Sequence, residues 1–153
     1  MTLPILCHPD PVLRQQALPV GKMDDTAAAL IEDLLQAMYR AGGRGLAAPQ
    51  VGALRRIFVM DIDWKEGPPR PLAFVDPEIL SQSDVKELGA EACLSIPDRS
   101  VEVWRSVAIT IAWRDHEGRA HRGQFEGIEA RCIQHEVDHL DGILCIDRAA
   151  ETA

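Results

Sequence analysis

Residues 134 to 142 read QHEVDHLDG and contain the pattern H-E-x-x-H. On a helical period of 3.6 residues, His135 and His139 lie one turn apart on the same face, so both imidazoles can bind one metal ion. Glu136 projects beside them, where its carboxylate can accept a proton from a metal-bound water. These residue types at this spacing indicate a metal-dependent hydrolase, because one helix carries both metal ligands and the base.

The flanking residues favour a half-buried helix over an ordinary amphipathic helix whose histidines are only structural. Gly127 and Gly142 bracket the segment, as expected for helix ends. The apolar side chains of the segment form one stripe: Ile128, Cys132, Ile133 and Leu140. The stripe gives the helix a buried face, and Glu136 occupies the position of a base.

Two histidines do not complete a catalytic metal site, which normally has three protein ligands and one open position. The candidates downstream of the helix are Cys145, Asp147 and Glu151. Residues 91 to 97, which read EACLSIP, offer a better third ligand. Pro97 keeps this segment extended or turning, so its backbone can present the thiol of Cys93.

Three segments together resemble the signature motifs of the peptide deformylase family. They read GRGLAAPQ at residues 43 to 50, EACLSIP at 91 to 97 and QHEVDHL at 134 to 140. The family motifs are G-x-G-L-A-A-x-Q, E-G-C-L-S and Q-H-E-x-D-H-L, and the likeness extends to Ile5–Leu18 and to the spacing between motifs. The resemblance implies a hydrolase that removes the N-formyl group from the formyl-methionine amino terminus of new polypeptides and releases formate.

The resemblance implies that Cys93, His135 and His139 are the metal ligands. Members of the family usually hold ferrous iron in the cell, and often zinc, nickel or cobalt after purification. One thiolate with two imidazoles binds several divalent metals, so the donor set does not name the ion. We therefore expect one divalent ion, Fe(II) in the cell, with Zn, Ni or Co as alternatives.

Further roles follow from the same resemblance. Glu136 is expected to be the general base, and it later passes a proton to the departing amine. The side chain of Gln50 and the backbone N–H of Leu94 are expected to stabilise the oxyanion on the formyl oxygen. Glu91 is expected to orient a ligand histidine, and Arg105 to hold that carboxylate in turn.

The resemblance also implies a substrate site of two parts. A loop pairs with the peptide backbone as an added strand does, and an apolar pocket before His135 takes the methionine side chain. The loop residues are Gly43, Arg44 and Gly45, and the pocket residues are Ile128, Arg131 and Cys132.

Two residues depart from the family motifs. Ala92 replaces the glycine that precedes the cysteine; with a positive φ this change costs about 1 kcal/mol, whereas with a negative φ it is mild. Arg44 replaces an aliphatic residue of many members, and its guanidinium is either solvated or available to an acidic substrate group. Efficiency and substrate identity depend on these two positions.

Two other classes of function share part of this pattern. A general metallopeptidase would carry the same helix, but the Cys93 segment disfavours it. A deformylase-like relative could act on another N-formyl amine, or could bind metal with little catalysis if Ala92 or Arg44 blocks the pocket.

Composition is typical of one compact catalytic domain over residues 1–153, with 46% apolar residues and no linker. The net charge of −8 argues against binding to DNA. No segment approaches the roughly 20 apolar residues of a membrane span, and no signal sequence is evident, so we expect a cytoplasmic protein. The expected partner is a formylated peptide or nascent chain. Contact with the ribosome is not assumed, because the carboxy-terminal tail is shorter than in many bacterial members.

The remaining patterns predict an α+β fold in which mostly antiparallel strands pack around a central helix carrying the HEVDH motif. A helix should begin at Asp24-Asp25 and end before Gly42. Strands are expected at residues 56–62, at 72–75 before Pro77, at 107–113 and, after a turn at 115–118, at 121–125. Cys7 and Cys145 are expected to be buried structural thiols. His8, His116 and His121 are expected in turns or exposed positions and not as ligands.

Overall fold

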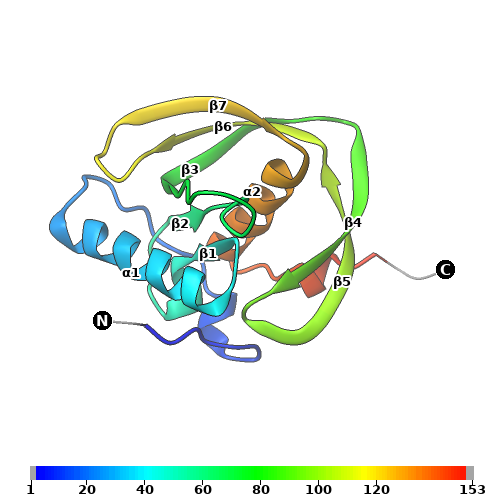
Figure 1. The fold of residues 1–153 in the computed structure, drawn as a ribbon, viewed down its shortest axis with the longest axis horizontal. Coiled ribbons are helices and arrows are strands. Elements are labelled where there is room, and N and C mark those ends of the chain that lie inside the picture. Colours follow the sequence, from blue (N-terminus) through cyan, green and yellow to red (C-terminus); the bar gives the residue numbers. More distant parts are fainter. Residues whose placement is uncertain (1–2, 151–153) are drawn as a thin grey trace.

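The computed structural model describes residues 3–150 and has the expected α+β architecture (Figure 1). A five-stranded antiparallel sheet has the order β1-β2-β3-β6-β7, and β4 and β5 form a separate hairpin. The strands are β1 (Gly45–Ala47), β2 (Ile57–Met60), β3 (Leu72–Gln82), β4 (Lys86–Cys93), β5 (Ile96–Ser106), β6 (Ala108–Arg114) and β7 (Ala120–Glu126). The helices are α1 (Asp25–Ala41) and α2 (Gly127–Leu140), with short 3-10 helices η1 (Pro11–Arg14), η2 (Ala48–Val51) and η3 (Cys145–Arg148).

Helix α1 has the ends that the sequence predicts. The side chain of Asp24 accepts a hydrogen bond from the N–H of Ala27 at 2.8 Å, and Gly42 ends the helix in the left-handed region at φ 75°. Leu34 and Met38 are fully buried on the face that packs against the sheet. The predicted helix is therefore confirmed.

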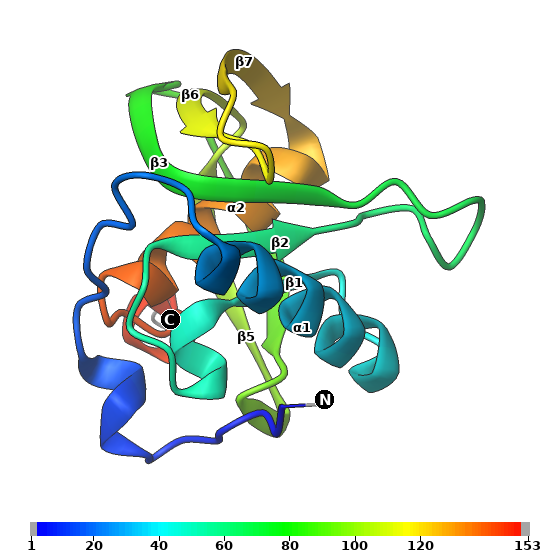
Figure 2. The ribbon, with the colours of Figure 1, turned by 90° about the vertical axis from the view of Figure 1, so that its left-hand side faces the viewer.

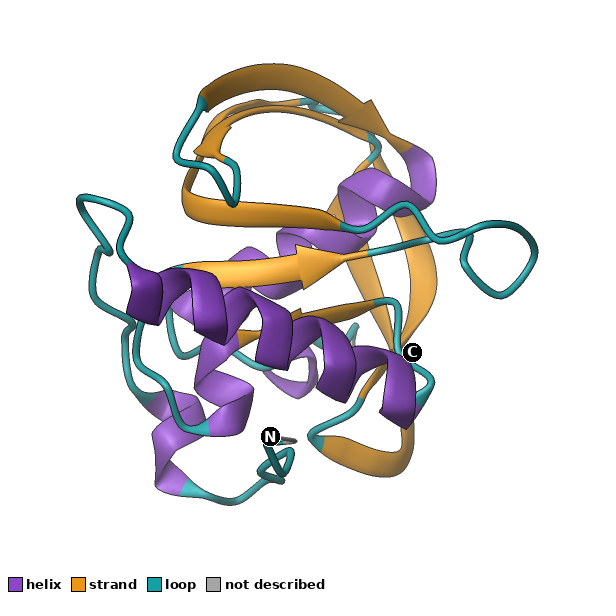
Figure 3. Ribbon diagram, turned by 60° about the vertical axis from the view of Figure 1, so that its left-hand side comes forward, coloured by secondary structure: helices purple, strands orange, loops and turns teal. Residues whose placement is uncertain are grey.

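The two helices cover opposite faces of the sheet around β2 (Figure 3). Ile57 and Val59 of β2 belong to the core under α1, whereas Phe58 and Met60 belong to the core under α2. All four residues are buried because successive side chains of a strand point to opposite faces. Helix α2 thus lies between this sheet and the β4–β5 hairpin, and the motif that it carries is central to the fold.

The apolar stripe of α2 is shorter than the sequence predicts. Ile133 and Leu140 are fully buried and Cys132 is half-buried. Ile128, however, is 56% exposed, so its assignment to the buried stripe is wrong. This residue lies in the first turn of the helix, directly after β7, and lines a pocket.

Strand β3 continues through Pro77, where the sequence analysis placed its end. The pairing with β6 shifts between Val75 and Glu78, because three steps along β3 accompany two steps along β6. Asp76 has a φ of 47° at this irregularity, and Pro77 needs no ladder hydrogen bond of its own there. The expectation that Pro77 ends the strand is therefore wrong.

The β4–β5 hairpin reverses direction at Leu94-Ser95, immediately after the thiol of Cys93. Two backbone hydrogen bonds tie the amino-terminal segment to both loops of the site: the N–H of Leu6 donates to Gln50 O at 2.7 Å, and the N–H of His8 donates to Ser95 O at 2.8 Å. The segment lies against the lower parts of both loops in Figure 2. It fixes residues 50 and 95 relative to each other.

The remaining expectations on single residues have mixed outcomes. All four thiols are free; Cys145 is buried as expected, but Cys7 is exposed, so that prediction is wrong. His8, His116 and His121 are all exposed, as expected. Within residues 3–150, no helix has the length and hydropathy to cross a membrane.

Gly142 is the position where the fold is least tolerant of a side chain. Its φ is +74°, and a Cβ would lie 2.5 Å from the backbone oxygen of Arg14. Gly21 has a similar φ of +72° with nothing within 4 Å of a Cβ. We expect Gly142→Ala to lower the free energy of unfolding by about 3 kcal/mol or more and Gly21→Ala by about 1 kcal/mol, measured by urea denaturation. Equal losses would contradict the close approach to Arg14.

Candidate metal and catalytic site

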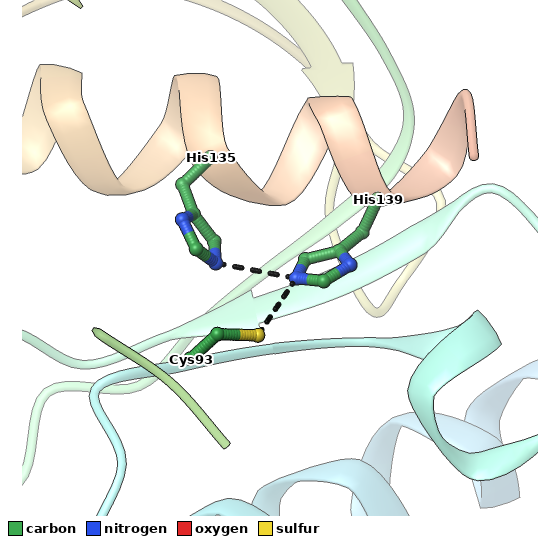
Figure 4. A group of neighbouring side chains, drawn as sticks. All are labelled: Cys93, His135 and His139. Atoms are coloured by element: carbon green, nitrogen blue, oxygen red, sulfur yellow. Dashed lines mark hydrogen bonds between the residues drawn. The ribbon is translucent and has the colours of Figure 1, made fainter. Parts of the chain in front are cut away.

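Three soft donor atoms from two distant segments converge at the centre of the molecule (Figure 4). Nε2 of His139 lies 3.2 Å from Nε2 of His135 and 3.4 Å from Sγ of Cys93. The two histidines project from successive turns of α2, and Cys93 comes from the end of β4. All three residues are at least nine-tenths buried. The structure thus brings together the three expected metal ligands.

These separations suit one tetrahedral ion. With metal–nitrogen bonds of about 2.0 Å and a metal–sulfur bond of about 2.3 Å, tetrahedral donors lie about 3.3–3.5 Å apart. Burial lowers the pKa of His139 well below its ordinary value, which keeps its imidazole neutral and able to bind a cation. The donor set and its spacing therefore fit a divalent metal ion.

Glu91 contacts His135, the kind of residue that the sequence predicts it to orient. Its Oε1 lies 2.9 Å from Nδ1 of His135, which leaves Nε2 directed at the metal position. Arg105 donates two hydrogen bonds to the same carboxylate, at 2.8 and 2.9 Å, and Arg131 donates another at 2.7 Å. Burial opposes the ionisation of Glu91, but the hydrogen bonds from Arg105 and His135 outweigh it and hold its pKa well below the ordinary value.

Two residues that the sequence analysis missed complete this network. Asp138 accepts from Nη1 of Arg105 at 2.7 Å, and Arg148 of η3 donates to both oxygens of Asp138 at 2.6 and 3.0 Å. Asp138 stands within the QHEVDHL motif, so its position was a signal that residue-type reasoning could have used. Arg148 has no such signal, because only the folded chain places it beside α2.

Glu136 lies beside the three donor atoms, in a buried environment that raises the pKa of its carboxyl group. It is 4% exposed, and burial raises its pKa to about 7. Its Oε1 is buried without a hydrogen-bond partner in the described part of the chain. A carboxylate with this pKa can both accept and release a proton near neutral pH, as a general base must.

Gln50 reaches the site from η2 and is 1% exposed. Its Oε1 accepts from the N–H of Ala47 at 2.9 Å, so the amide nitrogen must point the other way. That Nε2 donates to Oγ of Ser95 at 3.0 Å and lies 3.7 Å from Sγ of Cys93. Ser95, a third residue that the sequence analysis did not single out, therefore helps to orient the amide towards the three donor atoms.

The glycines of the first motif allow β1 to approach the site closely. A Cβ on Gly45 would lie 2.6 Å from Oε2 of Glu136, and a Cβ on Gly43 would lie 2.6 Å from Cδ1 of Leu94. Strand β1 is also at the edge of the sheet, with β2 as its neighbour on one side. Its other edge is available to an extended peptide.

A cavity of about 360 Å³ opens beside the donor atoms. The expected substrate residues all line it: Gly43, Arg44, Gly45, Ile128, Arg131 and Cys132. Leu94 and the catalytic candidates Gln50 and Glu136 line it as well. Arg131, however, uses its guanidinium on Glu91 and on the backbone oxygens of Glu87 and Val103 of the hairpin. Its contacts therefore hold β4 and β5 against α2.

The two departures from the family motifs leave the site open. Ala92 lies within β4 opposite Ser100, and it is not among the residues with positive φ, so the mild alternative applies. Arg44 is half-exposed, and its Nη2 donates to Oε1 of Glu66 at 3.1 Å. Neither side chain fills the cavity.

Comparisons with known proteins agree with this geometry. The sequence profile of the polypeptide deformylase family matches residues 2–153. Peptide deformylase from Zymomonas mobilis is 44% identical over 149 residues, which cover 95% of this chain and 84% of that relative. The crystal structure of peptide deformylase from Thermotoga maritima has a TM-score of 0.92 and 42% identity, and covers 99% of both chains. That of the Synechococcus elongatus enzyme in complex with actinonin has a TM-score of 0.93 and 40% identity, covering 97% of this chain and 81% of the other.

The buried charges predict a pH-dependent role for Arg105. Arg105→Met leaves the carboxylate of Glu91 buried with fewer partners, so we expect the free energy of unfolding at pH 7 to fall by about 3–5 kcal/mol. Because the folded-state pKa of Glu91 lies below its ordinary value of 4.5, this stabilisation is present above pH 4.5 and is lost as the pH falls. Urea denaturation of metal-free protein at several pH values measures the difference. Arg99→Met, at an exposed position of β5, is the control, and a loss that is the same at pH 7 and pH 3.5 would contradict the prediction.

Glu136 should have the opposite pH dependence. Its pKa rises from 4.5 to about 7 on folding, so the folded chain binds the proton more tightly and stability falls as the pH rises between these values. Glu136→Gln removes this effect. We expect metal-free wild type to lose about 3 kcal/mol more than Glu136→Gln between pH 4.5 and pH 8, measured by urea denaturation. Parallel stability profiles would show that the carboxylate titrates at its ordinary pKa.

Proposed function

The chain belongs to the polypeptide deformylase family, and we propose that Cys93, His135 and His139 hold its divalent metal ion while Glu136 is the general base. The function of the family is the removal of the N-formyl group from the amino terminus of new polypeptides, and the chain has this function. One observation carries the assignment of residues: the three donor atoms lie within 4.8 Å of one another beside the buried carboxylate of Glu136.

A divalent ion, when bound, supplies Lewis acidity, which makes water a nucleophile near neutral pH and polarises a carbonyl oxygen. Glu136 takes the proton that the attacking water loses as a C–O bond forms at the formyl carbon. It then delivers that proton to the amine nitrogen as the C–N bond breaks. Burial, which raises the pKa of this carboxyl, favours its holding the proton between the two steps, and formate and a free amino terminus are the products.

We assign the stabilisation of the oxyanion to Nε2 of Gln50 and to the backbone N–H of Leu94. The hydrogen bond from Ala47 to Oε1 supports the role of Gln50, because it fixes which end of the amide faces the cavity. Donors that are already oriented need no rearrangement as negative charge develops, and one such donor contributes about 3 kcal/mol to the lowering of the barrier.

We further propose that the formylated peptide binds along the free edge of β1. Gly43, Arg44 and Gly45 would pair with its backbone, and the methionine side chain would lie near Cys132 and Ile128. The half-buried Cys132 and the apolar part of Ile128 offer contacts to a thioether side chain.

The resemblance favours ferrous iron as the ion in the cell, since the donor set itself also suits zinc, nickel or cobalt. We propose a single catalytic domain that acts in the cytoplasm on formylated peptides or nascent chains.

Formate release from formyl-Met-Ala-Ser tests these assignments. With protein loaded anaerobically with Fe(II), we expect Glu136→Gln to lower kcat by about 100-fold or more while the bound metal stays near one ion per chain, because the ligands are intact. Glu129→Gln, which changes an exposed carboxylate in the first turn of the same helix, is the matched control. Full activity in Glu136→Gln would refute the role of the base, and no release by metal-loaded wild type would refute the function.

A further inference from the structure

Two cationic side chains stand at one end of the cavity that holds the site. Arg44 lies between the two glycines of the first motif, and Lys65 comes from the connection between β2 and β3. This connection extends from the body of the fold in Figure 2. Arg44 is half-exposed and Lys65 is exposed, so both charges can meet a ligand.

Several contacts hold the connection against the loop that contains Arg44. Nε1 of Trp64 donates to Gly43 O at 2.9 Å, and the N–H of Asp61 donates to Arg44 O at 2.9 Å. The ring of Trp64 also packs edge-to-face on Tyr39, with 5.1 Å between centroids. Arg44 and Lys65 therefore come from two segments of the cavity lining that are hydrogen-bonded to each other.

The guanidinium of Arg44 has donors to spare. It has five N–H donors, and one of them is used on Glu66 in a pair whose side chains are 39% and 63% exposed. Exposed pairs of this kind contribute roughly 0.2–1 kcal/mol. Nε of Arg44 is buried and has no hydrogen-bond partner within residues 3–150, so the donors left for a ligand are those of the two terminal nitrogens. A carboxylate from a ligand can therefore join or replace Glu66 at little cost.

The other charged groups that line the cavity are already engaged or buried. Glu91 is held by Arg105 and Arg131, and Glu136 is 4% exposed. Glu66, the acidic partner of Arg44, does not line the cavity. The accessible charge at this end of the cavity is therefore positive, although the whole chain carries a net charge of −8. Because salt screens charges beyond about 8 Å at physiological ionic strength, the local pair decides what binds there.

We propose that Arg44 and Lys65 form a subsite for a carboxylate side chain, so that the enzyme prefers peptides with an acidic residue in one of the two positions after formyl-methionine. The proposal rests on the proposed function, because it assumes that the peptide follows β1. Residue 44 immediately precedes β1 and is next to Gly45, where a Cβ would lie 2.6 Å from Oε2 of Glu136, so the side chain of a neighbouring peptide residue comes within reach of Arg44.

Pairs of peptides that differ only in aspartate or asparagine test this preference, because the two side chains have nearly the same shape but differ in charge. The substrates are formyl-Met-Asp-Ser and formyl-Met-Asn-Ser, and formyl-Met-Ala-Asp and formyl-Met-Ala-Asn, with kcat/KM measured from formate release by the Fe(II) protein. We expect the acidic peptide of at least one pair to be favoured by about 3- to 10-fold, and the ratio to shrink between 0.05 and 0.5 M salt. Ratios of one or below in both pairs would overturn the subsite, while turnover of the asparagine peptides would leave the deformylase function intact.

Three variants should change the ratio of kcat/KM for the acidic peptide to that for its amide counterpart, two lowering it and one raising it. Arg44→Gln and Lys65→Met should each lower it towards one, whereas Glu66→Gln should raise it, because that change frees the guanidinium. Arg119→Gln and Glu117→Gln alter a comparable exposed pair, 2.9 Å apart in the turn before β7 and outside the cavity, and should leave the ratio unchanged. If Arg44→Gln folds poorly, the ratios measured with Lys65→Met and Glu66→Gln still test the proposed subsite. A ratio unmoved by both of these variants would overturn the proposal.

Discussion

The buried ion pair between Glu91 and Arg105 is the constraint on which the geometry of the site depends. Both side chains are about 5% exposed, and removing two charges from water costs several kcal/mol for each unless every partner is in place. Arg131 and His135 complete the partners of Glu91, and Asp138 completes those of Arg105. These partners lie on the β4–β5 hairpin and on α2. Their hydrogen bonds can therefore all form in only one position of the hairpin relative to the helix. In that position the thiol of Cys93 meets the two imidazoles of the motif helix.

How much of the fold could be predicted depended on whether local patterns agreed with tertiary contacts. Helix α1 was predicted closely, because Asp24, Gly42 and the apolar period all act within the segment itself. The β4–β5 hairpin was not, since its inward positions are Gly89, Glu91 and Cys93 and do not resemble an apolar face. Glu91 and Cys93 are buried because their partners, Arg105 and the two histidines of α2, lie in distant segments of the chain. The prediction that the strand ends before Pro77 was wrong for a related reason. A register shift between β3 and β6 removes the need for the backbone hydrogen bond that a proline cannot donate.

The residues of the candidate site likewise divide into those that the sequence predicted and those that only the folded chain brings together. Residue types and spacing predicted two histidine ligands and the base and offered Cys93 as a third ligand, while the family motifs added Gln50 and the substrate loop. Ser95, Arg148 and the contact of Trp64 with Gly43 could not be found from the sequence, because each acts through one partner far away in the chain. A serine, an arginine or a tryptophan at these positions would be equally compatible with an ordinary surface residue. Their contacts arise only when folding brings the distant partner close.

Close packing around the first motif leaves room for a side chain at its middle position but not at the two flanking glycines. A Cβ at Gly43 would press on Leu94, and a Cβ at Gly45 would press on the carboxylate of Glu136, so side chains at either position would displace parts of the catalytic site. Residue 44 between them directs its side chain to the half-exposed wall of the cavity, where it meets Glu66 and not the metal ligands. A change from an aliphatic residue to arginine there alters the charge met by a bound peptide while the distances among ligands and base stay the same. In the proposed mechanism, adjacent residues at the start of β1 therefore have separate roles: residue 44 meets the peptide side chain, and Gly45 leaves room for the carboxylate of Glu136.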